Sequence, residues 1–144
     1  MDDGEFEEYL APCGDDQVAG LRFLRDLVQT HGGGLDESVN TGRWLEGFVF
    51  YSTAGQMVYA MGPKGRSKTT FHMMPFYGST ALQERHGPAL APFLTGKSCI
   101  AFRNVTELPT DALVDIVARG TSVMRRMLEE HATPRSAPRP RGGT

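Results

Sequence analysis

The chain has 144 residues, of which 40% are hydrophobic and 22% are charged, and its formal net charge is −2 at pH 7. A chain of this length buries about two thirds of its unfolded surface on folding, which is enough for one domain with a core of its own. A net charge this close to zero produces no global field that favours nucleic acid, and no apolar run approaches the ~20 residues that cross a bilayer. We therefore expect neither nucleic acid nor a membrane among its partners.

The two cysteines, Cys13 and Cys99, are far apart in the sequence and predict neither a zinc site nor a disulfide framework. The opening residues MDDGEFEEYL have no basic region followed by an apolar stretch, so they do not read as a signal peptide. These features predict a reduced, cytoplasmic protein. Cys99 lies in the apolar run SCIAF, which favours burial as a small hydrophobic side chain, and activation by a histidine base is the alternative.

Composition divides the chain into three parts. Residues 1–14 are acidic and contain a proline and two glycines, which predicts a flexible lead. Residues 15–132 carry the periodic apolar patterns of a single domain. Residues 133–144, TPRSAPRPRGGT, cannot bury apolar surface and are predicted to be disordered.

The domain is predicted to begin with a helix over residues 18–31, capped by Asp15 or Asp16. Its apolar side chains recur every three or four residues, and three glycines follow it. Three strands in a meander come next, over residues 44–51, 56–61 and 69–77. Pro75 cannot donate a hydrogen bond to a sheet, so it predicts a bulge or a free edge in the third strand, and a free edge would allow pairing with a second copy of the chain.

The second half is predicted to contain a short helix, a further helical turn, a fourth strand and a long final helix, over residues 80–86, 89–94, 98–103 and 110 onward. Thr80 and Gln83 fit a capping box at the start of the short helix, and Gly87-Pro88 restarts the chain. The final helix has the clearest helical periodicity. Gly120 lies on its apolar face, which indicates either the close approach of a strand or a kink.

The predicted order is therefore α-β-β-β-α-β-α. Connections of these lengths favour an α+β fold in which an antiparallel or mixed four-stranded sheet carries its helices on one side.

Two places could bind a ligand. The loop between the second and third strands holds Lys64, Arg66 and Lys68, which could contact an anion, although the loop lacks the spacing of a phosphate loop and a solvated hairpin is the ordinary alternative. The other place is the sheet around His72, where an imidazole suited to proton transfer could face a groove. We expect that groove to be framed by Trp44, Tyr51, Tyr59 and His72.

The hairpin GFVFYSTAGQMVYAM, the strand KTTFHMMPFY and the segment TGKSCIAF resemble the YdhG-like family of small bacterial domains of unknown function. The resemblance extends over about Val18 to Met127 and implies an α+β sandwich with an antiparallel sheet. One branch of that family is described as a frataxin-like iron chaperone, so the resemblance also implies iron binding through surface carboxylates. No other cofactor is indicated.

Three hypotheses follow. The first is a non-enzymatic module that binds a small ligand or a protein partner at the aromatic groove. The second is iron binding or delivery, which predicts an acidic patch formed by Asp15, Asp16, Asp36, Glu37 and Glu46. The third is a small enzyme with His72 as a general base, which requires a second titratable group within hydrogen-bond reach of His72.

Overall fold

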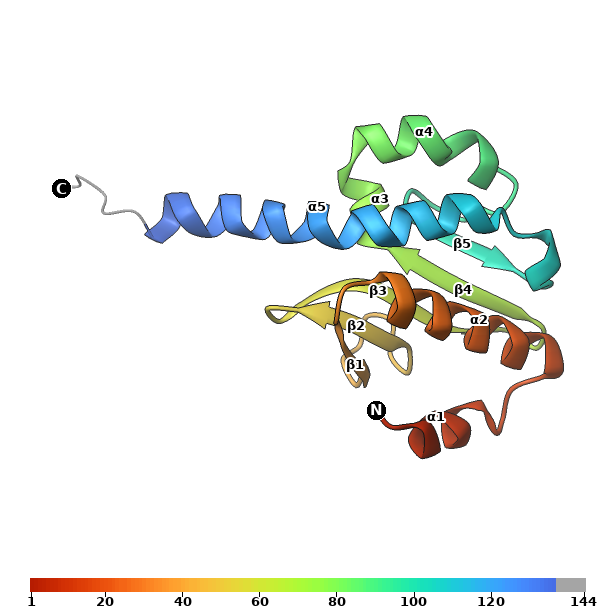
Figure 1. Cartoon of the computed structure of the whole chain (residues 1–144). Coiled ribbons are helices and arrows are strands. Elements are labelled where there is room, and N and C mark those ends of the chain that lie inside the picture. Colours follow the sequence, from red (N-terminus) through yellow and green to blue (C-terminus); the bar gives the residue numbers. More distant parts are fainter. Residues whose placement is uncertain (137–144) are drawn as a thin grey trace.

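The computed structural model describes residues 1–136 and shows an α+β fold built on a five-stranded antiparallel sheet (Figure 1). The strands cross the sheet in chain order, so each strand pairs with its neighbours in the sequence. Their bounds are β1 Asp36–Val39, β2 Val49–Thr53, β3 Gln56–Lys64, β4 Lys68–Met73 and β5 Cys99–Phe102. The α+β class predicted from the sequence is confirmed, whereas the prediction of four strands is wrong.

The strand that sequence reasoning missed is β1. Its sequence, DESV, is mostly exposed and lies at an edge of the sheet, where it pairs with β2 alone. A short, charged edge strand resists pairing with other molecules but shows little of the apolar alternation that marks a half-buried strand. The strand predicted over residues 44–51 also begins later, at Val49, because residues 40–48 form a loop.

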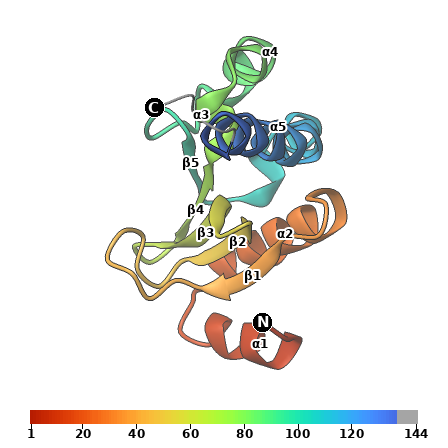
Figure 2. The same cartoon turned by 90° about the vertical axis from the view of Figure 1, so that its left-hand side faces the viewer.

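Two long helices, α2 (Asp15–His31) and α5 (Thr110–Ser136), cover one face of the sheet (Figure 2). Side chains from both helices and from the middle strands are fully buried between these layers: Leu21, Leu24, Leu113, Ile116, Val117, Tyr59, Phe71 and Met73. Burial of each such side chain stabilises the fold by about 1.5–3 kcal/mol. Among residues 1–136, no helix of comparable length lies on the opposite face of the sheet.

Both helices carry a glycine where neighbouring side chains leave no room for a Cβ atom. A Cβ atom on Gly20 of α2 would lie 2.6 Å from Oγ1 of Thr69, and one on Gly120 of α5 would lie 2.7 Å from the hydroxyl of Tyr59. Gly120 was predicted to mark the close approach of a strand or a kink, and the atoms it meets are the end of the Tyr59 side chain and Pro75. The start of α2 differs from expectation, because Gly14 is the N-cap and donates its N–H to Oε1 of Gln17 at 3.0 Å. Asp15 and Asp16 lie in the first turn instead.

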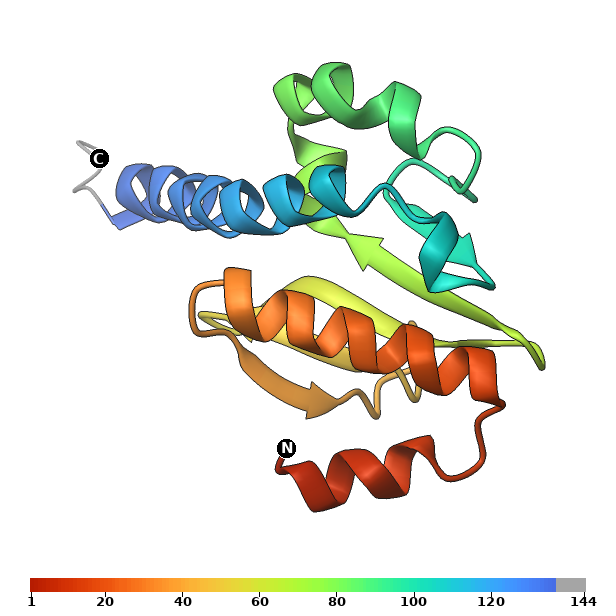
Figure 3. The same cartoon turned by 45° about the vertical axis from the view of Figure 1, so that its right-hand side comes forward.

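The expected flexible lead contains a helix, α1 (Asp3–Leu10), which begins with a capping box between Asp2 and Glu5. This helix packs beside α2 and β1 (Figure 3) and buries Phe6 and Leu10 at 3% and 4% exposure. The prediction of a loosely attached segment is corrected on this point. These two apolar side chains anchor the helix together with Asp3 and Glu7, which pair with Arg25 and Arg22 of α2.

The strand predicted over residues 69–77 ends at Met73. Pro75 lies in the first turn of a short helix, α3 (Met74–Gly78), where its missing N–H costs nothing. Ser79 then caps α4 (Thr80–Leu90) by accepting the N–H of Leu82, and α4 continues through Gly87-Pro88 without the predicted restart. Gln83 therefore does not complete a capping box.

A 3-10 turn, Val105–Glu107, leads into α5. The helix extends to Ser136 and so includes the first residues of the segment predicted to be disordered. The remainder of that segment lies outside the described residues.

Candidate functional site

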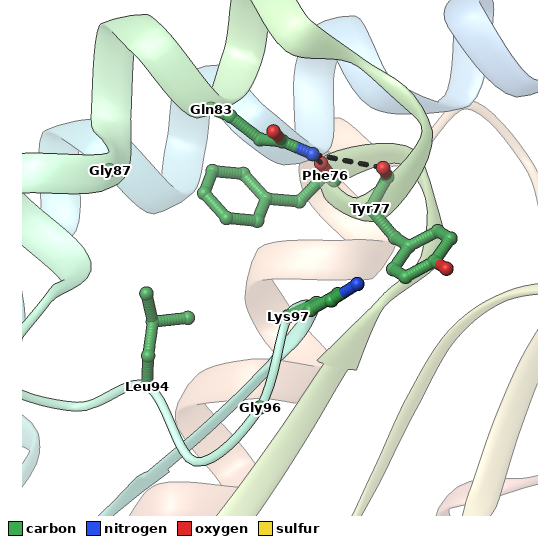
Figure 4. A pocket seen from close by; sticks show the side chains of 7 residues that line it. All are labelled: Phe76, Tyr77, Gln83, Gly87, Leu94, Gly96 and Lys97. Atoms are coloured by element: carbon green, nitrogen blue, oxygen red, sulfur yellow. Dashed lines mark hydrogen bonds between the residues drawn. The ribbon is translucent and has the colours of Figure 1, made fainter.

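A cleft of about 580 Å³ opens where α3, α4 and the connection to β5 meet (Figure 4). Its walls come from three elements: Phe76 and Tyr77 from α3, Gln83 and Gly87 from α4, and Leu94, Gly96 and Lys97 from the connection. This volume falls within the range of about 300–1,000 Å³ that is usual for small-molecule sites. More of the cleft surface is apolar than polar, and Tyr77, Gln83 and Lys97 bring polar groups to it.

The turn from β4 into α3 builds one wall of the cleft. Phe76 is buried at 2% exposure, whereas Tyr77 next to it is 52% exposed. Figure 4 shows the Phe76 ring directed into the space between α4 and the connection, with Tyr77 and Lys97 at its side. The Lys97 ammonium lies 6.0 Å from the centroid of the Tyr77 ring, at the outer limit of a cation–π contact.

Gln83 holds this wall in place. Its side-chain amide donates to the carbonyl oxygens of Phe76 and Tyr77, both at 2.9 Å. Both N–H bonds of that amide are thus used, and Oε1 is the atom through which Gln83 can accept a hydrogen bond from a ligand. Gly87 and Gly96 border open space, where an added Cβ would meet no atom within 4 Å. The backbone is therefore accessible at both positions.

The opposite wall is held by backbone pairing. The N–H of Thr95 donates to the carbonyl of Cys99 at 3.0 Å, and the N–H of Ala101 donates to the carbonyl of Phe93, also at 3.0 Å. Leu94 forms an isolated antiparallel bridge with Ile100. These bonds fold the connection back along β5 and fix the position of Lys97 between them.

His72 lies on the face of the sheet opposite α2 and α5, because strand alternation turns its neighbours Phe71 and Met73 toward the helices. Cys99 is its direct partner across the β4–β5 pairing, and His72 Nδ1 contacts Cys99 Sγ at 2.5 Å. The other ring nitrogen, Nε2, lies 3.2 Å from Sδ of Met74. Burial lowers the pKa of His72 and raises the pKa of the Cys99 thiol, so both groups are neutral near pH 7.

Trp44 covers the His72 ring from the loop between β1 and β2. The two rings are edge to face, with their centroids 5.4 Å apart, and Trp44 remains 59% exposed. Asn40 braces this loop by donating to the carbonyls of Trp44 and Leu45. The hydroxyl of Tyr9 donates to Gly47 of the same loop at 2.6 Å. Trp44 is thus held beside His72 from both ends of its loop.

The four residues expected to frame one groove are divided between the two faces of the sheet. Tyr51 and Tyr59 point into the core, with 1% and 0% exposure. Tyr51 donates to Glu37 at 2.7 Å, and Tyr59 donates to the carbonyl of Val117 at 3.0 Å. The expected groove with all four aromatic groups is therefore corrected to a contact between Trp44 and His72 alone.

The acidic residues proposed as iron ligands are not gathered. Glu37 is buried in a network with Arg25 and Tyr51, and Asp16 pairs with Arg103 at 3.0 Å. Asp15 lies at the start of α2, whereas Asp36 lies on β1. Within residues 1–136, no group of three or more His, Cys, Asp or Glu side chains is arranged to hold a metal ion. The predicted patch is thus corrected, and the iron hypothesis depends on the family resemblance alone.

Lys64, Arg66 and Lys68 are exposed on the hairpin between β3 and β4. Gln17 of α2 holds the hairpin backbone in place, because its Nε2 donates to the carbonyls of Gly65 and Lys68 at 2.9 and 3.0 Å. The three cations thus lie on a braced turn with their side chains in solvent.

Sequence reasoning singled out His72 but not the lining of the cleft. Tyr77 was assigned to a strand and Lys97 to no element, and only the folding of α3, α4 and the connection brings them together. A local signal was present in Pro75, which marks a helix start as well as a bulge. The partnership of His72 with Cys99 depends on strand register, which neither residue reveals alone.

No protein-family model, curated protein or solved structure matches this chain. Among the described helices, none has the length and apolar character needed to cross a membrane.

Proposed function

We propose that this protein is a non-enzymatic small-ligand-binding module of the YdhG-like type, acting in the cytoplasm, and that the cleft between α3, α4 and the connection to β5 is its binding site. The observation that carries the proposal is the pair formed by Lys97 and Tyr77 beside the buried residue Phe76. A cation and an exposed aromatic ring at the rim of an apolar cleft suit a small amphipathic anion.

The polar groups define the ligand further. No carboxylate of the described residues forms an ion pair with Lys97, so its charge is available to a ligand anion such as a carboxylate. Gln83 Oε1 can accept from a hydroxyl or amine of the ligand, and the apolar walls suit an aromatic or branched body. We propose a small aromatic or branched carboxylate that also carries one hydrogen-bond donor.

Calorimetry with 4-hydroxyphenylacetate and its neutral amide tests this proposal. A charge-assisted hydrogen bond contributes about 1.5–3 kcal/mol, so we expect the acid to bind at least tenfold more tightly than the amide. Lys97→Met, which keeps the aliphatic stem, should abolish that preference, whereas Lys68→Met on the distant hairpin should not. Equal binding of acid and amide, or a preference that persists in Lys97→Met, would contradict the proposal.

A further inference from the structure

The pair formed by His72 and Cys99 is separate from the cleft lining and has a chemistry of its own. The two residues are opposite each other on β4 and β5, so the sheet itself fixes the contact between the imidazole and the thiol. Cys99 is partly exposed, whereas His72 is 7% exposed. The base is therefore enclosed, whereas Cys99 lies partly in solvent.

Met74 determines which nitrogen of His72 carries the proton. The thioether sulfur of Met74 can only accept a hydrogen bond, and it lies 3.2 Å from Nε2. In the neutral imidazole the proton is therefore on Nε2, and Nδ1 presents its lone pair to Sγ of Cys99. The thiol donates to that lone pair, so a proton acceptor is already in place for the sulfur.

We propose that Cys99 is a nucleophilic site that captures α,β-unsaturated carbonyl compounds, with His72 as the base that accepts its thiol proton. Sγ forms a bond to the β-carbon of the electrophile as the thiol proton moves to Nδ1. The π electrons of the C=C bond move toward the carbonyl, and the resulting enolate takes a proton from Nδ1 at its α-carbon. The product is a thioether, nothing is oxidised or reduced, and His72 returns to its neutral form.

The surroundings favour this addition over other thiol reactions. An addition expels no leaving group, so it needs no second acid to protonate one, and the single proton of the Cys99–His72 pair suffices. Lys64 is the charged group that acts on Cys99, and its positive charge opposes the rise in the thiol pKa that burial causes. The side chains that contact the imidazole, Met74 and Trp44, are uncharged. This environment suits an uncharged electrophile.

The test uses N-ethylmaleimide as the probe and peptide mass spectrometry to follow each cysteine separately. Cys13 is the internal reference, because it is also partly exposed but its thiol donates to the carbonyl of Tyr9, at 3.8 Å, instead of to an imidazole. At pH 6.5 we expect Cys99 to react at least tenfold faster than Cys13. His72→Gln should slow Cys99 at least tenfold and leave Cys13 unchanged, since general bases contribute about 10²–10⁴-fold. His131→Gln, an exposed histidine, is the matched control and should change neither rate.

If His72→Gln fails to fold, Cys13 will react faster in that variant than in the unaltered protein. A second measurement then tests the proposal without any substitution. In the unaltered protein, a thiol without a base loses about tenfold in rate per pH unit below its pKa. The reaction rate of Cys99 should instead stay constant from pH 8 down to the pH at which His72 is protonated. Parallel pH profiles for Cys99 and Cys13, or an unchanged Cys99 rate in folded His72→Gln, would overturn the proposal.

Discussion

Trp44 is the only tryptophan of the chain and lies edge to face against His72, so its fluorescence can report the protonation of that ring. A protonated imidazole quenches indole emission, and burial lowers the pKa of His72 below its ordinary value of 6.5. We expect the emission to decrease in a single step as the pH falls below 6.5. Fluorescence titration of His72→Gln should be flat over the same range. A step that persists in that variant would assign the titration to another group.

Gly120 shows how one missing side chain positions a helix. A Cβ atom there would lie 2.7 Å from the Tyr59 hydroxyl and 2.9 Å from Cβ of Pro75. Gly120→Ala should therefore destabilise the fold by about 1–3 kcal/mol, although alanine favours the helix by up to ~1 kcal/mol. Urea unfolding measures this loss. Ala118→Gly is the control, because it changes helix propensity alone at an exposed position of the same helix. If Gly120→Ala is more stable than the unaltered protein, the contact of residue 120 with Tyr59 and Pro75 is not tight.

At the scale of elements, one buried ionic network joins α1, α2 and β1. Glu37 of β1 accepts two bonds from the Arg25 guanidinium, at 2.9 and 3.0 Å, and one from Tyr51. The Arg25 guanidinium also pairs with Asp3 of α1 and lies 4.4 Å from the centroid of the Phe6 ring. The side chains of Glu37 and Arg25 are only 8% and 12% exposed, so their charges depend on each other.

Glu37→Gln removes one charge of this network and leaves the guanidinium of Arg25 largely buried beside a neutral amide. Breaking a buried ion pair from one side costs about 3–5 kcal/mol, and we expect a loss near the lower value because Asp3 remains. Thermal and urea unfolding measure it. Glu7→Gln, which breaks the exposed pair with Arg22, is the matched control and should leave the midpoint nearly unchanged. Equal effects of the two variants would contradict the role of burial.

The elements also show what could be predicted from the sequence. Helices α2 and α5 were predictable because their apolar side chains follow the helical period along many residues. Strand β1 and helix α1 were not, since β1 is polar and α1 buries only Phe6 and Leu10. In the candidate sites, His72 was recognisable as a titratable group in a strand. Its contact with Cys99 and the meeting of Tyr77 with Lys97 arise from register and tertiary packing, which local patterns do not encode.

For the whole molecule, stability should be greatest near neutral pH. Burial lowers the pKa of His72, and hydrogen bonds from His86 and Arg119 hold the pKa of Asp115 below its ordinary value of 3.8. A group with a lowered pKa stabilises the fold above its unfolded pKa and loses that contribution as the pH falls through the folded value. We therefore expect the folding stability to decrease in two steps as the solution is acidified, one below pH 6.5 and one below pH 3.8.

Stability also falls at alkaline pH, where the groups responsible have pKa values that folding raises. Burial raises the pKa of Cys99 from 9.0 and that of Tyr59 to about 12, so the unfolded chain releases these protons first and stability falls above pH 9. Urea midpoints measured from pH 3 to 11 test both sides. His72→Gln should remove the loss below pH 6.5, and Asp115→Asn the loss below pH 3.8. If the urea midpoint of either variant still decreases over the corresponding pH range, other groups cause that loss of stability.

The chain-order meander has a consequence for synthesis. Strands β2, β3 and β4 can each pair with the strand made just before, but α5, whose Val117 carbonyl accepts from the Tyr59 hydroxyl, is made after all of them. At ~5–20 residues per second, roughly 3–12 s separate the completion of β4 from that of α5. During that time the nascent chain presents an apolar sheet face that α2 covers and that α5 does not yet cover. The growing polypeptide is thus most open to chaperones, and to association with other nascent chains, while its second half is still being translated.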